Sequence, residues 1–90
     1  MPQAWVYMLR CADGSLYTGW TNDVERRLAS HRAGRASRYT RARLPVELAA
    51  CFPMGDAGEA RREEARIKRL RRPQKLALAD TASSRTLHPG

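Results

Sequence analysis

Residues 5–20 read WVYMLRCADGSLYTGW and decide the fold. Two runs typical of β-strands, residues 4–10 and 15–20, flank an Asp-Gly pair, and this arrangement is a strong short-range signal for a β-hairpin. Each run carries one tyrosine, Tyr7 or Tyr17. The length of the loop between the runs therefore decides whether the two phenols share one face of the sheet.

Two loop lengths fit this turn. A two-residue loop, Asp13-Gly14, pairs Tyr17 with Arg10 and places the tyrosines on opposite faces. A three-residue loop, Ala12-Asp13-Gly14, pairs Tyr17 with Leu9 and places both tyrosines on one face. We expect the three-residue loop, because Gly14 adopts the left-handed conformation required at the third position without a steric cost.

The residues after the hairpin predict a helix, a loop and a third strand. Thr21 or Asn22 is expected to cap a helix that runs to about Arg32 and stops near Gly34. Residues 33–44 form a loop rich in arginine, and Pro45 opens a strand over residues 46–52. The alternation of that strand places four apolar residues on one face, namely Val46, Leu48, Ala50 and Phe52.

The C-terminal part predicts two more helices. One covers about residues 57–72 and ends before Pro73, and a short one runs from Pro73 through Ala79. Residues 80–90 show no periodicity and are expected to be a mobile tail that follows a single domain over residues 1–79. The order ββαβαα predicts an α+β fold with a small, three-stranded, largely antiparallel sheet flanked by helices.

The composition indicates a polyanionic partner. The chain has 90 residues, a net charge of +8 and 42% hydrophobic residues, which suits one small globular domain and excludes wholesale disorder. Of its 17 basic residues, 15 are arginine, the side chain that binds phosphate bidentately. Nucleic acid is the expected partner, and a charged surface that serves only solubility is the alternative.

The two cysteines, Cys11 and Cys51, have neither the spacing of metal ligands nor a disulfide pattern. Each falls in a predicted strand, where a free cysteine behaves as a small buried hydrophobic residue, and this fits a reducing cytoplasm. The sequence shows no signal peptide or membrane span, so no membrane partner is expected.

The helix that follows the hairpin carries two candidate site residues. Val24 and Leu28 mark its apolar face. At about 100° per residue, Arg27 and His31 lie at the edge of that face and turn toward the hairpin, whereas Arg26 points away. The plain alternatives are a half-buried histidine with satisfied hydrogen bonds and an arginine whose stem covers apolar surface.

Two carboxylates lie near the apolar face of the predicted helix over residues 57–72. Glu63 and Glu64 both fall within about 60° of Ile67 on the helical wheel. A carboxylate so near the core is costly unless it is paired or binds a metal. An ion pair of Glu64 with Lys68 is the alternative, and the spacing, which leans slightly to Glu63, does not choose between the two carboxylates.

The loop region is strongly basic. Seven arginines and no acidic residue lie between residues 26 and 43, with one tyrosine among them. Basic side chains interleaved with an aromatic ring suit a groove that follows a nucleic acid backbone and offers a stacking platform, and an ordinary exposed loop is the alternative. The candidate nucleic-acid-binding residues are Arg10, Arg35, Arg38, Tyr39, Arg41 and Lys68.

Taken in order, these features resemble the GIY-YIG nuclease superfamily, specifically its small stand-alone, single-domain bacterial branch. The resemblance covers about residues 4–79. Val6-Tyr7 looks like the end of the first signature element, and Tyr17-Thr18-Gly19 looks like the second. Two departures are Trp20, where some relatives carry lysine, and Leu76, where others carry asparagine.

The resemblance extends to the helices. Arg27 lies ten residues after Tyr17 and matches the catalytic arginine of the family, and His31 matches the histidine that often follows one turn later. Glu64, within Glu-x-x-Ile-Lys, looks like the single metal-binding glutamate, so the resemblance favours Glu64 over Glu63.

The resemblance implies a divalent-metal-dependent endonuclease that hydrolyses phosphodiesters in DNA. Its target would be a substrate structure or damage, as in DNA repair, rather than a sequence. Glu64 would hold one Mg²⁺ or Mn²⁺, Arg27 would neutralise the transition-state phosphate, and Tyr7, Tyr17 or His31 would position or deprotonate the attacking water.

The alternative is a catalytically weak module that binds DNA or RNA. An inward carboxylate at Glu64 would repel phosphate and has no use in such a module, so it favours the enzyme.

Overall fold

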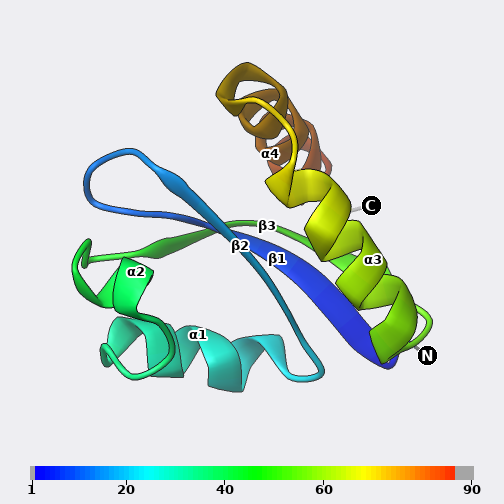
Figure 1. Cartoon of the computed structure of the whole chain (residues 1–90), viewed down its shortest axis with the longest axis horizontal. Coiled ribbons are helices and arrows are strands. Elements are labelled where there is room, and N and C mark those ends of the chain that lie inside the picture. The colour runs from blue at the N-terminus through cyan, green and yellow to red at the C-terminus, as the bar shows by residue number, and fades with distance from the viewer. Residues whose placement is uncertain (1, 87–90) are drawn as a thin grey trace.

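The structure is a computed structural model that describes residues 2–86, with side chains for residues 2–81. It is an α+β fold with one antiparallel sheet in the order β2-β1-β3 (Figure 1). The strands are β1 (Ala4–Arg10), β2 (Leu16–Thr21) and β3 (Glu47–Met54). The predicted fold class is therefore confirmed, and β1 is the central strand.

The hairpin between β1 and β2 has the expected three-residue loop. Leu9 pairs with Tyr17, and the Cys11 N–H donates to the Ser15 carbonyl at 2.9 Å. Gly14 has φ 83°, in the left-handed region that glycine adopts most readily. The prediction of the loop was correct, and Tyr7 and Tyr17 lie on the same face.

Four helices complete the described part of the chain. They are α1 (Val24–Arg32), α2 (Arg38–Arg41), α3 (Ala57–Lys68) and α4 (Arg72–Thr86). The short helix α2 lies within the stretch expected to be only a loop. It is capped by the Ser37 hydroxyl, which accepts from the backbone N–H groups of Tyr39 and Thr40.

The N-cap of α1 differs from the expected one. Asp23 caps the helix, and its carboxylate accepts from the Arg26 N–H at 3.1 Å. Thr21 is the last residue of β2, and its hydroxyl accepts from the Asp23 N–H at 3.1 Å instead. The prediction of Thr21 or Asn22 was wrong because the strand runs one residue further and a carboxylate occupies the positive end of the helix dipole.

Strand β3 does not keep one face along its whole length. Met8 pairs with Ala50 but Leu9 pairs with Leu48, so the register shifts by one residue there. Val46 packs beside Tyr7, whereas Ala50 packs with Met8 on the other face. The expectation that Val46, Leu48, Ala50 and Phe52 share a face was wrong, because this irregularity reverses the alternation.

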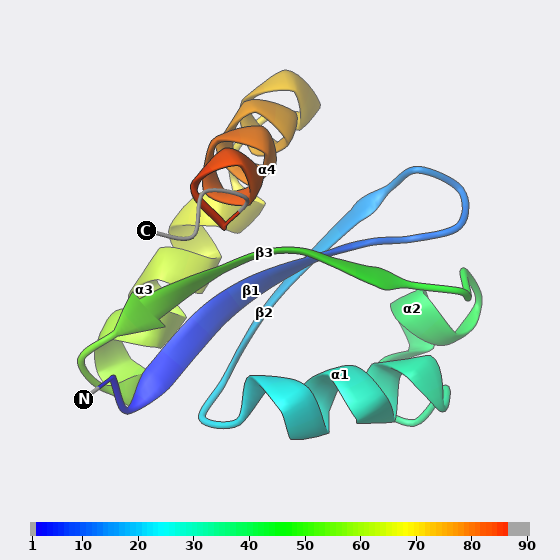
Figure 2. The same cartoon turned by 180° about the vertical axis from the view of Figure 1, so that it is seen from behind.

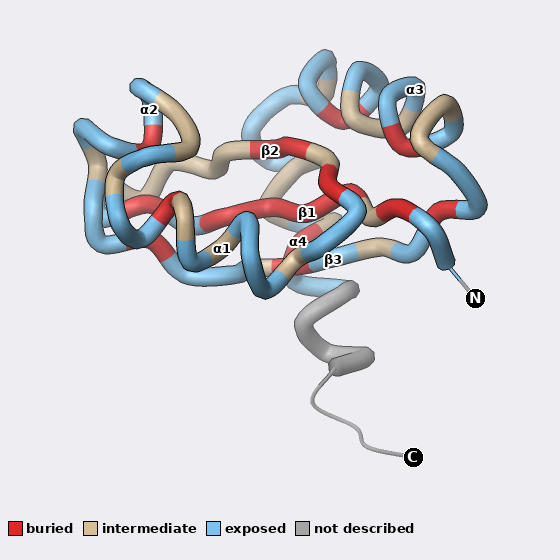
Figure 3. Tube along the Cα trace, turned by 90° about the horizontal axis from the view of Figure 1, so that it is seen from below, coloured by how far each residue is buried: buried red, intermediate tan, exposed pale blue. Residues whose placement is uncertain are grey.

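The sheet separates two hydrophobic cores. On one face Val6 and Met8 pack against α3 and α4 through Ala60, Ile67 and Ala79. On the other face the apolar residues pack with α1 and the segment before β3; they are Tyr7, Leu9, Cys11, Val46, Tyr17 and Leu28. Figure 2 shows α1 and α2 on one side of the sheet and α3 and α4 on the other, and Figure 3 shows the buried residues concentrated along β1.

The two cysteines differ in exposure. Cys11 follows β1 and is buried, as expected, whereas Cys51 lies on β3 and is exposed. The prediction that Cys51 is buried was wrong because β3 is an edge strand and its outward residues have no layer above them. Both thiols are free.

Helix α4 is longer than predicted. It continues past the expected end at Ala79 as far as Thr86, so residues 80–86 have regular structure. The predicted end was wrong because residues 80–86 contain no proline or glycine to stop the helix, although they have no apolar face. Residues 87–90 lie outside the described residues, and the mobility of the tail stays a prediction.

No helix in the described part of the chain is long and apolar enough to cross a bilayer.

Candidate active site

The two tyrosines of the hairpin form one aromatic group with His31. Tyr7 is buried at 2% exposure, and its ring centroid lies 6.4 Å from that of Tyr17. The His31 ring stands edge-on to both phenols, with centroids 5.6 Å from Tyr7 and 5.1 Å from Tyr17. The face that the loop length gave to the tyrosines is thus the face toward which α1 turns His31.

A chain of hydrogen bonds runs through the buried histidine. Tyr7 Oη lies 2.8 Å from His31 Nε2, and His31 Nδ1 lies 2.8 Å from Thr40 Oγ1. The Thr40 hydroxyl also lies within donating distance of the Ser37 carbonyl, at 3.3 Å. His31 and Thr40 are both fully buried. The imidazole is therefore held from both sides and shielded from water.

Gly19 sets how Tyr7 lies. It pairs with Tyr7 across the hairpin, and a Cβ at this position would lie 2.6 Å from Tyr7 Oη and 2.7 Å from Tyr7 Cζ. No side chain fits in that space unless the phenol moves. The close approach of the ring to the Gly19 backbone fixes the direction in which the hydroxyl points.

The surroundings shift the pKa of Tyr7 and of His31 in opposite directions. Burial raises the pKa of Tyr7 to about 12, Tyr17 and Glu64 add to the rise, and the charge of Arg27 opposes it. Burial, assisted by the charge of Arg27, lowers the pKa of His31. At neutral pH both groups are uncharged, and Arg27 and Glu64 both lie within electrostatic reach of the Tyr7 phenol.

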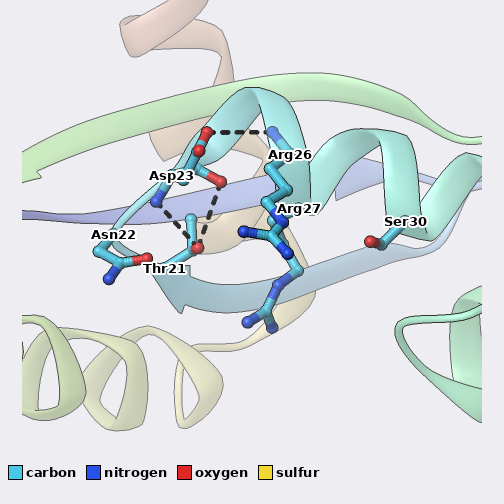
Figure 4. A pocket seen from close by; sticks show the side chains of 6 residues that line it. All are labelled: Thr21, Asn22, Asp23, Arg26, Arg27 and Ser30. Atoms are coloured by element: carbon cyan, nitrogen blue, oxygen red, sulfur yellow. Dashed lines mark hydrogen bonds between the residues drawn. The ribbon is translucent and has the colours of Figure 1, made fainter.

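Arg27 lies where the site opens to solvent. An open cleft of about 540 Å³ at the start of α1 is lined by Thr21, Asn22, Asp23, Arg26, Arg27 and Ser30 (Figure 4). Arg27 also lines a neighbouring hollow of about 330 Å³ with Trp20, Thr21 and Asn22. Both arginines line the first cleft, but only Arg27 reaches the second hollow and acts on Tyr7 and His31.

Glu64 lies on α3 and is paired within its own helix. Its carboxylate lies 3.6 Å from Lys68 Nζ, and its side chain is 22% exposed. Glu63 is paired with Arg66 in the same way and is 29% exposed. The ion pair of Glu64 with Lys68, expected as the plain alternative, is therefore present. Of the two carboxylates, only Glu64 acts on the pKa of Tyr7.

The donors fit one kind of metal. No group of three or more His, Cys, Asp or Glu side chains suited to a metal gathers among the described residues, so these residues offer no protein cage for zinc. Mg²⁺ and Mn²⁺ accept a site made of one or two carboxylates, with water and substrate phosphate as the remaining ligands. The half-buried Glu64 carboxylate suits such a site.

The expected nucleic-acid-binding residues are spread over several surfaces. Arg35, Arg38 and Arg41 are exposed around α2, and Lys68 is exposed beside Glu64. Arg10 lies elsewhere, in a small cavity with Glu47 and Asp80 on the face that α4 covers. Arg10 does not join the tyrosines, because residues 7 and 10 point to opposite faces of a strand.

The ring of Tyr39 is already engaged. The Arg43 guanidinium lies 3.8 Å from its centroid, and Tyr17 contacts it from another side at 6.0 Å between centroids. Arg43 also donates to Asp13 in the hairpin loop at 3.1 Å and to the Tyr39 carbonyl at 3.0 Å. Tyr39 thus carries Arg43 on one face, where a stacked base was expected, and it braces Tyr17.

Three residues that matter to this site are missing from the prediction: Gly19, Thr40 and Arg43. Gly19 had a signal, because it faces Tyr7 in the predicted register. Thr40 had a weaker one, because Ser37 and Thr40 have the spacing of a helix cap followed by a residue of the first turn. Arg43 had none, since its partner Asp13 is 30 residues away.

This geometry can be set beside what is known of similar proteins. A family model described as "GIY-YIG catalytic domain" matches residues 3–77. The chain belongs to the GIY-YIG family. Membership implies nuclease-type activity on a nucleic acid, and nucleases of this family generally depend on a divalent metal.

Similar GIY-YIG proteins carry the name UPF0213. One from Nitratidesulfovibrio vulgaris is 54% identical over 84% of this chain and 69% of its own length. One from Halobacterium salinarum is 51% identical over 81% of this chain and 95% of its own length. A solution NMR structure of a UPF0213 protein from Bacillus halodurans has a TM-score of 0.59 and 41% identity, and it covers 89% of this chain and 85% of that one.

Proposed function

We propose that this GIY-YIG protein is a divalent-metal-dependent endonuclease that hydrolyses phosphodiesters in DNA and selects its target by structure or damage rather than by sequence. The observation that carries the proposal is the buried Tyr7–His31–Thr40 hydrogen-bond chain, placed on a face that Arg27 and Glu64 both influence. A protein that only binds nucleic acid has no need of a dry, oriented proton acceptor.

The Tyr7–His31 pair is suited to take a proton from water. A phenol with a pKa of about 12 is a poor base by itself, because its phenolate is rare at neutral pH. In the proposed step Tyr7 Oη accepts a proton from water while its own proton passes to His31 Nε2, 2.8 Å away. Tyr7 stays neutral throughout, and the charge moves to the imidazole.

The bond changes follow from that transfer. The hydroxide attacks the phosphorus atom, the bond to one ester oxygen breaks, and that oxygen takes a proton from solvent. The imidazolium of His31 then returns its proton through Tyr7 to water. The net reaction is one phosphodiester and one water to one phosphomonoester and one alcohol.

The other side chains have separate roles. Tyr17 is half-buried beside both rings, so it is placed to hold the attacking water. Arg27 offers a guanidinium to the phosphate as negative charge builds up on it. Glu64 would hold Mg²⁺ or Mn²⁺, which when bound supplies Lewis acidity at a phosphate oxygen and stabilises charge on the leaving oxygen.

A cleavage assay tests the proposal. Single-stranded, duplex and branched DNA and RNA are each incubated with the protein and Mg²⁺ or Mn²⁺. We expect metal-dependent cleavage of DNA, strongest on branched or damaged substrates. Glu64→Ala should lower the cleavage rate by about 10³-fold or more, because the variant loses the proposed metal ligand. Binding of the nucleic acid should stay intact or become tighter, because a negative charge near the phosphate is removed. Tyr17→Phe should lower the rate while the fold is retained.

Glu63→Ala is the matched control, since Glu63 has the same helix, exposure class and kind of ion pair as Glu64. Equal loss in both variants would contradict the role of Glu64. The ion pair of Glu64 with Lys68 favours one second candidate, a catalytically weak module that binds DNA or RNA. That candidate predicts binding without metal-dependent cleavage of any of these substrates.

A further inference from the structure

The short helix α2 provides a side chain that the proposed chemistry has not used. Thr40 is fully buried, and its Oγ1 lies 2.8 Å from His31 Nδ1. It lies nine residues after His31, and Ser37 fixes its position by capping α2. Because Thr40 is sealed from solvent, it cannot touch a nucleic acid, and any effect on the reaction passes through His31.

The hydrogen bonds of the Thr40 hydroxyl bear on which nitrogen of His31 carries a hydrogen. The Thr40 hydroxyl has one hydrogen, and the Ser37 carbonyl at 3.3 Å can only accept it. The Thr40 oxygen then accepts from His31 Nδ1–H. In that arrangement neutral His31 has no hydrogen on Nε2, and Nε2, 2.8 Å from Tyr7 Oη, is an acceptor for the Tyr7 hydroxyl.

We propose that Thr40 is a positioning residue that fixes His31 in the Nδ1–H tautomer and so makes Nε2 the acceptor for the Tyr7 proton. The inference rests on the proposed function for its catalytic consequence. In the opposite tautomer Nε2–H would donate to Tyr7 Oη, and His31 could not take the phenol proton.

The chemistry of the orienting group matters as well. The groups that face His31 are Tyr7 from β1, Tyr17 from β2, Arg27 from α1 and Thr40 from α2. Among the described residues, no carboxylate forms a hydrogen bond or ion pair with the imidazole. A neutral hydroxyl orients the ring and stabilises the imidazolium less than a carboxylate would, so the proton is returned readily after each turnover.

The test uses nitrogen NMR of His31 together with cleavage kinetics. Thr40→Val removes the hydroxyl and keeps the shape, and Thr40→Ser keeps the hydroxyl. Thr18→Val is the matched control, because the Thr18 hydroxyl is also buried but has no hydrogen-bond partner among the described residues. Wild type and all three variants are compared for the His31 tautomer, the pKa of His31, kcat and KM.

We expect the Nδ1–H tautomer in wild type, Thr40→Ser and Thr18→Val, and the Nε2–H tautomer in Thr40→Val. In Thr40→Val the pKa of His31 should fall further, because the imidazolium loses an acceptor. Its kcat should fall about 10- to 100-fold with KM unchanged. A merely structural role would admit water and move the pKa of His31 up toward its ordinary value.

An Nε2–H tautomer in wild type overturns the inference even if Thr40→Val does not fold. A rise in the pKa of His31 in folded Thr40→Val, or an equal loss of kcat in Thr18→Val, overturns it as well. Failure of the wild-type protein to cleave any substrate counts against the proposed function alone, since the tautomer is read without a reaction.

Discussion

The site has two halves that are built differently: a phenol half, Tyr7 with His31, and a carboxylate half, Glu64. Tyr7 and His31 are buried, close-packed and hydrogen-bonded across three elements, β1, α1 and α2. Glu64 lies half-buried on α3, and its paired cation belongs to the same helix. In the proposed mechanism the proton-transfer half is thus set before any ligand arrives, whereas the carboxylate of Glu64 would exchange Lys68 for a metal ion.

The difference indicates where the protein needs precision. A proton moves only over hydrogen-bond distances, so its donor and acceptor must be held rigidly. A cation with water and phosphate ligands adjusts to its substrate, so one movable carboxylate is enough. Each of the following predictions changes one half and asks whether the other half responds.

Of the changes that follow, Gly19→Ala in the rigid half is expected to have the largest effect. The added methyl would overlap Tyr7 Oη and Cζ, so the phenol must shift. We expect the cleavage rate to fall about 10²-fold and the free energy of unfolding to fall by about 1–3 kcal/mol. Kinetics and chemical denaturation measure both. Wild-type rates in a fully folded Gly19→Ala protein would show that the orientation of Tyr7 is unimportant.

The next effect is the dependence on pH, which also belongs to the rigid half. His31 must be neutral to accept a proton, and burial lowers its pKa below the ordinary value. The rate kcat/KM should therefore stay level down to pH 6.5 and then drop about tenfold per pH unit below the pKa of His31. Tyr7, with a pKa of about 12, adds no fall on the alkaline side of neutrality.

The free energy of unfolding is also expected to fall as the pH falls, as the rate does. The pKa of His31 is lower in the folded than in the unfolded chain, so protons favour the unfolded state. The contribution of His31 to the free energy of unfolding is complete above its pKa in the unfolded chain. It declines as the pH falls toward the pKa of His31 in the folded chain. Two results would assign the pH dependence of kcat/KM to another group. One is a rate that begins to fall well above pH 6.5, and the other is a His31→Gln variant whose rate falls at low pH as in the wild type.

A paired measurement of stability compares the halves directly. Tyr7→Phe leaves the buried Nε2 of His31 without a donor and should cost about 1–3 kcal/mol. Glu64→Gln loses an intrahelical pair at 3.6 Å and should cost less than about 0.5 kcal/mol. Thermal unfolding of both variants checks the contrast. Equal costs would show that the carboxylate half is as firmly built as the phenol half.

The smallest effects are expected from the exposed arginines of α2, which belong to neither half. Arg38→Ala and Arg41→Ala should each weaken DNA binding severalfold and lower the slope of log K against log salt by about one. Titrations at several salt concentrations measure this. Arg10 lies on the face covered by α4. An Arg10→Ala slope change as large as that of Arg38→Ala would show that nucleic acid also reaches that face.

Much of the fold could be predicted because its signals are local. The Asp-Gly turn, the glycine at its third position and the alternation in β1 and β2 predicted the hairpin and the shared face of Tyr7 and Tyr17. The shift of register in β3 could not be predicted, because it depends on which strand Leu48 and Ala50 meet. The extension of α4 beyond Ala79 was missed because those residues have no periodic apolar face.

The candidate site divides in the same way. Helical spacing and family resemblance selected Arg27, His31 and Glu64, and the structure brings the first two to the tyrosines. Thr40 was missed because it reaches His31 only through the turn that α2 makes. The position of Arg10 was predictable, since simple alternation from Tyr7 already puts it on the other face, and its binding of nucleic acid stays a prediction.

The register shift in β3 has a consequence for how the molecule opens. Each side of the sheet has its own core, and because of the shift β3 contributes Ala50 to one side while Val46, just before β3, packs on the other. Local unfolding of the layer made of α1 and α2 would therefore leave Val6 and Met8 covered by α3 and α4. In the proposed reaction such an opening would give water access to Tyr7 while α3 continues to hold Glu64 in place.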